Sequence, residues 1–504
     1  MTHNRHHDLL AHAVYRDDSV VAITHGKQFL SVADLRHKSG QLALQLVTQG
    51  AQRAALQARN GCDWMIADLA CQLAGIPLLP LPGFFSAGQL RHAMLQTAVD
   101  VVLTDNPQSL QNLGIEFSRA GLSDCTSLSV LTRSPSAPEA LAETGCVPDG
   151  TGKITYTSGS TGAPKGVCLG NDQLIRQALA LRDVVALTRP RHLCLLPLSV
   201  LLENVAGVYT CLLAGGEVRV PDLATIGLGG SSTLNIGALA RAIDQHQPNS
   251  LILVPQLLSA LVSACEQGWQ PPASLQFIAV GGARVSARQI LRARDYGLPV
   301  YEGYGLSECA SVVSLNTPQR DRPGSAGQPL PHLEVHSDAG EITIAGNPFL
   351  GYVGEPDSWH QSKVRSGDLG TLDSAGFLHL SGRSKNLLIS SFGRNISPEW
   401  VESELMASPL ICDCIVFGDA RPWLTALICP QPGIDDNAIN HWISHCNQQL
   451  PDYARVQAWQ RLAEPLAAVP DLLTATGKPR RAEIHHHFAA ALETLYEKPA
   501  EVTL

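Results

Sequence analysis

The stretch "YTSGSTGAPKGV", from Tyr156 to Val167, sets serine, threonine and glycine around a single cation, Lys165. Glycine loses much backbone entropy on ordering, and serine and threonine compete with helical hydrogen bonds, so the run Ser158–Gly166 suits neither a helix nor a core strand. Its many backbone N–H groups and Lys165 could together cradle a polyphosphate. Taken alone, the stretch is equally compatible with a phosphate loop and with a flexible connector.

Two other chemically active loops do not fit these residues. A Walker loop needs a serine or threonine directly after its lysine, whereas Gly166 follows Lys165. The nucleophile elbow of α/β-hydrolases needs a glycine where Ser158 stands. The stretch therefore predicts neither a Walker-type nucleoside triphosphatase nor an α/β-hydrolase.

Composition limits the class of protein that could carry this loop. The chain has 504 residues, 45% of them apolar, which is enough for two or three domains with buried cores. Its 45 acidic and 36 basic residues give a net charge of −9, so nucleic acid is not an expected partner. The 13 cysteines are scattered, and Cys412 and Cys414 lack a C-x-x-C spacing, which favours a reducing compartment.

Neither a targeting signal nor a membrane span is expected. The N-terminal residues "MTHNRHHDLLAH" contain no apolar segment of signal-peptide length. The richest apolar run, "LCLLPLSVLLENVAGVY", is interrupted by Pro197, Glu203 and Asn204. These features predict a soluble, cytoplasmic protein, and they leave peripheral membrane contact open.

The elements that must position the loop alternate between strands and helices over the first 380 residues. "VVLTD", "LILVP" and "FIAVGG" are typical of buried strands that end in turn residues, while "DWMIADLACQLAGI" has apolar residues at helical spacing. This alternation predicts α/β sheets, whose ligands lie beyond the carboxyl ends of the strands.

The pattern changes towards the C-terminus. From "EITIAG" to "GFLHLSGR" a two-residue period with glycine turns predicts antiparallel strands in a small β subdomain. Ser397 can cap a helix opened by Pro398, and "CIVFGDA" and "LTALICP" are typical of strands. We therefore expect an N-terminal domain over residues 1–382 and a smaller α+β C-terminal domain over residues 383–504. The segment "TIGLGGSSTLN" is expected to be a mobile loop.

The opening loop closely resembles the signature phosphate loop of the adenylate-forming, or AMP-binding, superfamily, which includes acyl-CoA synthetases, luciferases and peptide-synthetase adenylation domains. Four more segments resemble motifs of that superfamily, in the same order and over essentially the whole chain. They are "GGARVS", "YEGYGLSEC", "RSGDLGTLDSAGFLHLSGRSKNLLI" and "LLTATGKPRR". The resemblance implies ATP, Mg²⁺ and coenzyme A as cofactors, an acyl-adenylate intermediate, and a C-terminal domain that swings between two half-reactions.

The resemblance also implies roles for individual residues. The phosphate loop would comprise Thr157, Ser158, Gly159, Ser160, Thr161, Gly162 and Lys165. Adenine would lie against Gly281, Gly282, Ala283, Tyr304 and Gly305, and ribose against Asp368 and Arg383. Ser307 would contact the α-phosphate, Glu308 would hold Mg²⁺, and Lys478 would bring a point charge to the reacting groups. Lys385 matches the hinge, and Gly393 would lie near the coenzyme A tunnel.

Two differences from the superfamily's usual pattern indicate which kind of carboxylic acid the protein would activate. Many relatives carry an aromatic residue or histidine where Ser199 and Val200 stand, and no aspartate lies there to pair with an amino acid, since Glu203 is offset. An acyl or aryl acid is therefore favoured over an amino acid. One extra residue between Arg383 and Gly393 makes the chain more similar to long-chain fatty acyl-CoA synthetases, so a medium- or long-chain fatty acid is expected, although 504 residues is short for that group.

Three alternatives accompany this interpretation. The chain could load an acyl-carrier protein instead of coenzyme A, although no hindering insertion lies between Lys385 and Ser397. It could also be a nucleotide-binding homologue that has lost catalysis. An amidase-type hydrolase, suggested by the G-G-S-S run at Gly229 to Ser232, lacks the glycines that should follow. The histidines near the two chain ends have no ligand partner at metal spacing and are expected to be solvated.

Overall fold

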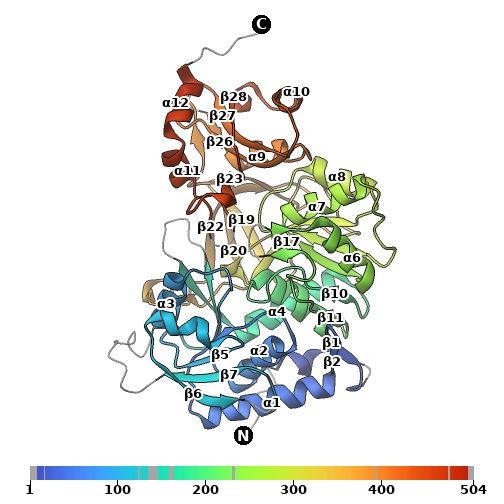
Figure 1. The fold of residues 1–504 in the computed structure, drawn as a ribbon, viewed down its shortest axis with the longest axis vertical. Helices are drawn as coiled ribbons and strands as arrows, with labels where there is room; N and C mark the ends of the chain where they lie inside the picture. Colours follow the sequence, from blue (N-terminus) through green and yellow to red (C-terminus); the bar gives the residue numbers. More distant parts are fainter. Residues whose placement is uncertain are drawn as a thin grey trace.

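The fold is known from a computed structural model, which describes residues 8–15, 17–122, 125–133, 146–157, 164–229, 233–391, 394–474 and 477–497. Figure 1 shows a broad N-terminal body, a β region above it, and a C-terminal part at the opposite end of the molecule from the N-terminus.

A nine-stranded sheet forms one half of the body in the described chain, and its strands from β16 to β1 run parallel. In spatial order the strands are β18 (Gln328–Pro329), β17 (Ser311–Leu315), β16 (Val300–Leu306), β15 (Phe277–Val280), β14 (Ser250–Leu253), β10 (Arg191–Leu193), β11 (Glu217–Arg219), β1 (Val21–His25) and β2 (Gln28–Ser31). β16 continues past its parallel neighbour and pairs antiparallel with β17 from Gly303 onward.

An eight-stranded sheet forms the other half. Its order is β21 (Gly351–Tyr352), β9 (Lys165–Gly170), β8 (Thr151–Thr157), β4 (Leu78–Pro80), β3 (Ala54–Gln57), β5 (Val101–Thr104), β7 (Ser129–Arg133) and β6 (Phe117–Leu122). β8 and β9 form an antiparallel pair in which Thr157 lies opposite Lys165. The segment that resembles a phosphate loop therefore connects the antiparallel strands β8 and β9.

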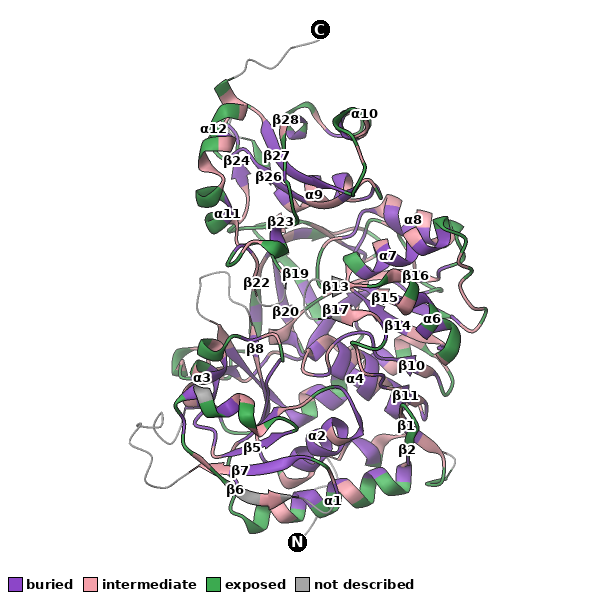
Figure 2. Ribbon diagram, viewed as in Figure 1, coloured by how far each residue is buried: buried purple, intermediate pink, exposed green. Residues whose placement is uncertain are grey.

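Helices fill the space between the two sheets and cover their outer faces. The inner helices are α1 (Val32–Thr48), α2 (Cys62–Ala74), α4 (Asn171–Val185), the π-helical η4 (Leu202–Tyr209) and α5 (Thr210–Leu213), whose apolar faces share one core with both sheets. The outer helices are α6 (Ile236–His246), α7 (Pro255–Glu266) and α8 (Ala287–Asp295) on the nine-stranded sheet, and α3 (Ala87–Gln96) and η3 (Pro107–Leu113) on the other. Figure 2 shows the strands buried between these layers.

A four-stranded antiparallel sheet links the body to the C-terminal part. It is formed by β19 (Glu334–Asp338), β20 (Glu341–Ala345), β22 (Lys363–Leu372) and β23 (Leu378–Arg383). The two-residue apolar period predicted the antiparallel region from β20 to β23 correctly, because one face packs on the core and the other faces outward, whereas β19 was not predicted.

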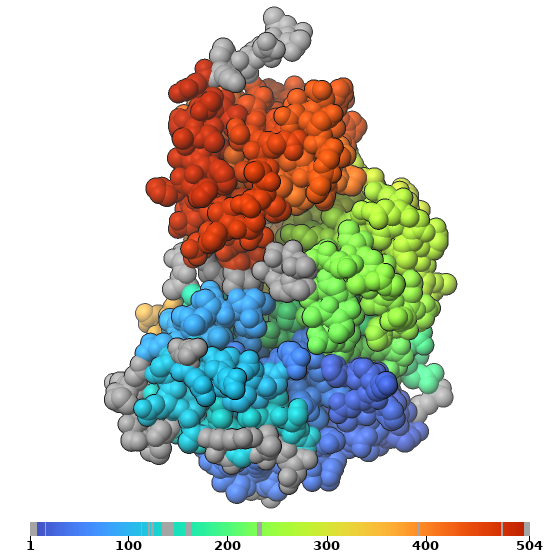
Figure 3. Space-filling model, in the orientation of Figure 1, coloured from blue at the N-terminus to red at the C-terminus, as the bar shows by residue number. Residues whose placement is uncertain are grey.

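The C-terminal part has its own sheet and cores. A short hairpin, β24 (Leu388–Ile389) and β25 (Asn395–Ile396), precedes the sheet of β26 (Ile411–Phe417), β27 (Leu424–Pro430) and β28 (Val456–Arg461). α9 (Pro398–Leu405) and α10 (Asp436–Asn447) cover one face, and α11 (Arg481–His487) and α12 (Ala489–Glu497) cover the other. Ser397 caps α9 by accepting a hydrogen bond from the N–H of Trp400, as predicted. Figure 3 shows this part as a separate lobe, coloured orange to red.

The fold class is the mixed α/β architecture expected from the sequence, with a large N-terminal and a smaller C-terminal part. The segment "TIGLGGSSTLN" differs from the expected loop, because β12 (Leu228–Gly229) and β13 (Thr233–Leu234) pair as a short hairpin. None of the helices in the described ranges is both long enough and apolar enough to cross a bilayer.

Candidate active site

One large cavity, of about 1890 Å³, opens where the two sheets of the body, the four-stranded sheet and the C-terminal part meet. Every predicted site residue that lies in the described chain lines it. These residues are Thr157, Lys165, Gly281, Gly282, Ala283, Tyr304, Gly305, Ser307, Glu308, Asp368, Arg383, Lys385 and Lys478. Residues 158–162 and Gly393, also predicted for the site, lie outside the described residues.

The carboxyl ends of β15 and β16 supply two turns. After β15 the chain turns at Gly281 and Gly282, where Gly282 has a φ of 84°, a conformation that favours glycine. Near the end of β16 the backbone of Gly305 lies so close to Ser311 that a Cβ atom would come within 1.8 Å of its carbonyl oxygen. Ser307 and Glu308 follow in the short 3₁₀ turn η5 (Ser307–Cys309). Glycine is therefore required at Gly282 by the backbone conformation and at Gly305 by the close packing against β17.

Lys165 and Glu308 both contact Tyr352 or Glu355, two residues that follow β20 in the chain. Lys165 Nζ lies 2.8 Å from Glu355 Oε1 and above the ring of Tyr352, 4.7 Å from its centroid. Tyr352 Oη donates a hydrogen bond of 2.9 Å to Glu308 Oε1. Neither Tyr352 nor Glu355 was predicted for the site, because neither belongs to a segment whose composition suggested chemistry.

Two side chains hold the carboxylate of Asp368 at the cavity wall. Its side chain is buried, and it accepts hydrogen bonds from Tyr304 Oη at 2.6 Å and from Arg383 Nε at 2.7 Å. Burial and the neighbouring Asp368 carboxylate both raise the pKa of Tyr304, so the phenol stays protonated and donates. Tyr304 and Arg383 thus orient both carboxylate oxygens of Asp368 at the wall of the cavity.

Lys478 reaches the cavity from the C-terminal part. Its loop is closed by backbone pairing of Leu473 with Pro479 and by a hydrogen bond of 3.0 Å from the N–H of Lys478 to Thr474 Oγ1. The surrounding protein and the Arg383 guanidinium lower the pKa of the Lys478 ammonium, while the carboxylates of Asp368 and Glu308 oppose that shift. Lys478 therefore lies within electrostatic reach of the groups that the nucleotide motifs supply.

Glu302 is a cavity residue that the sequence analysis did not select. It lies two residues before Tyr304 on β16, so both side chains share one face of the strand. Burial raises the pKa of Glu302 to about 8, against the opposing charge of Arg284. Its Oε2 atom is buried and has no hydrogen-bond partner among the described residues. Its place inside the "YEGYGLSEC" motif was the only available signal.

Apolar residues of the nine-stranded sheet, η4 and α4 line one part of the cavity, which we call the apolar limb. Ile252 and Ala279 lie opposite each other on β14 and β15 and form its floor. Its other lining residues include Leu181, Val185, Leu187, Leu202, Ala206, Thr210 and Phe277.

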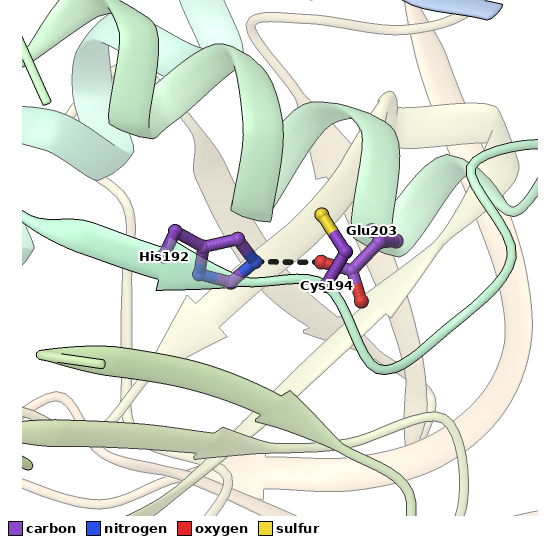
Figure 4. A group of neighbouring side chains, drawn as sticks. All are labelled: His192, Cys194 and Glu203. Atoms are coloured by element: carbon purple, nitrogen blue, oxygen red, sulfur yellow. Dashed lines mark hydrogen bonds and ion pairs between the residues drawn. The ribbon is translucent and has the colours of Figure 1, made fainter. Parts of the chain in front are cut away.

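A buried polar group fixes the wall of this limb. His192 Nε2 lies 2.6 Å from Glu203 Oε1, and Glu203 Oε2 accepts hydrogen bonds from the backbone of Leu195 and Leu196. Cys194 lies beside the pair, as Figure 4 shows, and burial and Glu203 raise the pKa of its thiol. These side-chain types can bind metals, and in this structure both carboxylate oxygens of Glu203 have hydrogen-bond partners within the protein. Glu203, offset in the sequence, therefore anchors η4.

A second buried group anchors η4 to the other sheet. Lys153, on β8, is 3% exposed, and its Nζ lies 2.7 Å from Asp68 Oδ1 on α2. Lys153 also donates to Asn204 and to Tyr209 Oη, both on η4, and Tyr209 donates to Asp68 at 2.7 Å. β8, the strand that precedes the predicted phosphate loop, is thus connected to η4, which lines the apolar limb.

Replacement of Lys153 by methionine should destabilise the body. The change leaves Asp68 buried without its cation, which typically costs about 3–5 kcal/mol in the free energy of unfolding. The measurement is denaturant unfolding followed by tryptophan fluorescence. Lys363→Met is the matched control, because Lys363 forms a long, exposed ion pair with Asp338, with 3.7 Å between Nζ and Oδ2. This substitution should change the free energy of unfolding by less than about 1 kcal/mol. Equal effects of the two substitutions would show that the buried ion pair of Lys153 and Asp68 does not stabilise the body.

The fold and the cavity define a class: a two-part α/β protein whose ligand site is assembled from three sheets and a loop of the C-terminal part. The chain belongs to the AMP-binding enzyme family, whose model matches residues 10–352, and residues 385–500 match the AMP-binding enzyme C-terminal domain. This result confirms the resemblance found in the five motifs.

Individual relatives are distant but match over most of their length. The chain is 24% identical to the long-chain-fatty-acid–CoA ligase FadD15 of Mycobacterium bovis, with 93% of this chain and 92% of that protein covered. It is 28% identical to 2-succinylbenzoate–CoA ligase of Bacillus velezensis, with 82% and 85% covered. Among solved structures, the anthranilate CoA ligase AuaEII in complex with anthranoyl-AMP has a TM-score of 0.79 at 17% identity, with 96% and 98% covered. The last likeness establishes the fold alone.

Proposed function

We propose that this chain is an ATP-dependent acid:thiol ligase, which converts a carboxylic acid to an acyl-adenylate and passes the acyl group to coenzyme A. The observation that carries the proposal is the large cavity in which Lys165, Glu308, Asp368 and Lys478 converge and from which an apolar limb leads away. The family match and the CoA ligases among the relatives support the same reaction.

In the first half-reaction a carboxylate oxygen attacks the α-phosphorus of ATP, the α–β phosphoanhydride bond breaks, and pyrophosphate leaves. Two anions must approach each other, so positive charge in the site is required to stabilise the transition state. Lys478 would place its ammonium by the carboxylate and the α-phosphate, and Lys165 would stabilise the departing pyrophosphate. In the second half-reaction the thiol sulfur attacks the acyl carbonyl, AMP leaves, and the thiol proton passes to solvent.

The described residues fit the nucleotide and the metal ion. Asp368 presents oriented oxygens that can accept hydrogen bonds from both ribose hydroxyls, and Tyr304 and the turn at Gly281 offer an aromatic face and bare backbone to adenine. Glu308 faces the cavity with a carboxylate, the ligand type that Mg²⁺ prefers. Bound Mg²⁺ would supply charge neutralisation on the phosphates.

We further propose that residues 1–382 and 383–504 move as two domains about Lys385. Lys385 is exposed and lies in the turn between β23 and β24, where the four-stranded sheet gives way to the C-terminal part. Rotation there would withdraw Lys478 and bring the segment that contains Gly393 towards the acyl-adenylate, so that one cavity serves both half-reactions in turn.

The proposed acid is a medium- or long-chain fatty acid. The aliphatic side chains of the apolar limb suit a flexible alkyl chain, which can adapt its shape to pack against them. Each buried CH₂ contributes about 0.8 kcal/mol, which corresponds to about fourfold in affinity. Activity should therefore rise steeply with chain length until the limb is full.

The purified protein should be incubated with ATP, Mg²⁺ and a panel of acids from acetate to palmitate, with benzoate and 2-succinylbenzoate, while pyrophosphate and acyl-CoA are followed separately. Pyrophosphate release and acyl-CoA formation that peak on a fatty acid would support the proposal in full. Highest activity with an aryl acid would support the ligase reaction and contradict the proposed fatty-acid substrate. Pyrophosphate without acyl-CoA would indicate a carrier-protein acceptor, and no release with any acid would support lost catalysis.

Ala206→Phe should shorten the accepted chain. Ala206 lies on η4 and lines the limb, so a phenyl group there would occupy space needed by the distal carbons. We expect kcat/KM for palmitate to fall at least tenfold relative to octanoate, measured by acyl-CoA formation. Ala33→Phe, on the exposed face of α1, is the matched control and should leave the ratio unchanged. An unchanged ratio in Ala206→Phe would place the acyl chain elsewhere.

A further inference from the structure

Helix α8 of the N-terminal body carries an arginine, Arg288, whose side chain contacts the C-terminal part. The guanidinium of Arg288 stacks on Trp442 of α10, 5.3 Å from the ring centroid, and it donates a hydrogen bond to the side chain of Gln449. Figure 1 shows α8 beside α9 at the junction of the two parts. Glu404 of α9 lies at the same junction, where burial raises the pKa of its carboxyl and the charges of Arg288 and Arg284 lower it.

The surface that receives Arg288 is rigid. Trp442 Nε1 donates a hydrogen bond of 2.9 Å to the carbonyl of Leu405, at the end of α9, and its ring stacks on His445 with centroids 5.3 Å apart. Trp442 also packs against the core beneath α9 and α10. Trp442 is therefore anchored to both α9 and the core of the C-terminal part.

The N-terminus of α8, which carries Arg288, is held by hydrogen bonds and directly follows a turn that lines the candidate nucleotide site. Ser286 caps α8 by accepting a hydrogen bond from the N–H of Gln289, and Gln289 Nε2 donates to Ser259 Oγ of α7 at 2.6 Å. The turn from Gly281 to Ser286, which opens α8, lines the large cavity. Arg288 directly follows Ala287, which also lines the cavity, so the cavity wall and the contact with the C-terminal part are adjacent in the chain.

We infer that Arg288 is a positioning residue that holds the C-terminal part where Lys478 enters the cavity. The inference rests on the proposed function, because it assigns the docked arrangement to the adenylation half-reaction. Arg288 contacts no reacting atom. It favours one of two domain positions by cation–π and hydrogen-bonding contacts that rotation about Lys385 would break.

Arg288→Met tests the inference, because it removes the charge and the planar donors but keeps an apolar stem. We expect ATP–pyrophosphate exchange to fall about tenfold. The rate of thioester formation from preformed acyl-adenylate should be unchanged or higher. Trp442→Leu should act in the same way, and the double variant should be no slower than the slower single variant. Arg292→Met is the matched control, since Arg292 lies on the same helix but pairs with Glu266 of α7.

Hydrogen–deuterium exchange of the interface peptides of α8 and α10 gives a second readout that needs no activity. In Arg288→Met these peptides should exchange faster while the core of β26 and β27 keeps its protection. Unchanged protection, or an equal loss in both half-reactions, would overturn the inference. If the unaltered protein shows no pyrophosphate exchange with any acid, the proposed function fails, and the exchange of the interface peptides still decides whether Arg288 docks the C-terminal part.

Discussion

Lys478→Ala should lower the rate of acyl-adenylate formation by about 100- to 1000-fold. Loss of one preorganised group that stabilises transition-state charge typically has an effect of this size. Lys478 is placed for that role by the paired loop between Leu473 and Pro479 and by the proximity of Arg383, Asp368 and Glu308. The measurement is ATP–pyrophosphate exchange with the best acid of the panel, together with single-turnover transfer from preformed acyl-adenylate. Transfer should be affected less than tenfold.

The pH profile separates a charge role of Lys478 from a structural one. The surrounding protein lowers the pKa of Lys478, so the ammonium loses its proton at a pH below the usual lysine range. Because the cationic form is required, exchange should decline as pH rises through that lowered pKa. Lys478→Arg should retain partial activity and shift the decline to higher pH, since guanidinium stays protonated. An alkaline limb that is unchanged in Lys478→Arg would assign the titration to another group.

Asp368→Ala should weaken ATP binding about 100-fold. The carboxylate is 6% exposed and is held by Tyr304 and Arg383, so its oxygens are oriented before the nucleotide binds. Loss of two charge-assisted hydrogen bonds to ribose costs about 3 kcal/mol, which corresponds to about two orders of magnitude in Kd. The measurement is equilibrium binding of ATP in the absence of acid.

A nucleotide without ribose hydroxyls provides the internal control for this prediction. If Asp368 acts on those hydroxyls, 2′,3′-dideoxy-ATP should bind the unaltered protein and the Asp368→Ala variant with similar affinity. Asp338→Asn, in the same sheet but away from the cavity, should bind ATP normally. An equal loss for ATP and its dideoxy analogue would mean that Asp368 acts through the packing of Tyr304 and Arg383 instead.

Local sequence was sufficient for most of the elements. Periodicity identified β5, β14 and β15 and the antiparallel region from β20 to β23, because burial on one or both faces imposes its own spacing on apolar residues. Ser397 was a correct N-cap for the equally local reason that its hydroxyl accepts from the N–H of Trp400. The hairpin of β12 and β13 was missed because glycine and serine fit turns and short strands alike.

The motif segments by themselves determined which residues were candidates for chemistry, and those of them that the structure describes all line one cavity. Only the tertiary structure decided what surrounds them. Three contacts, Glu355 with Lys165, Glu203 with His192 and Arg288 with Trp442, join positions separated by 11 to 190 residues. A charged residue on a helix or loop looks the same in sequence whether it faces water or a partner, because its local propensity is unchanged. Its partner is set by how sheets and domains pack, which depends on the chain as a whole.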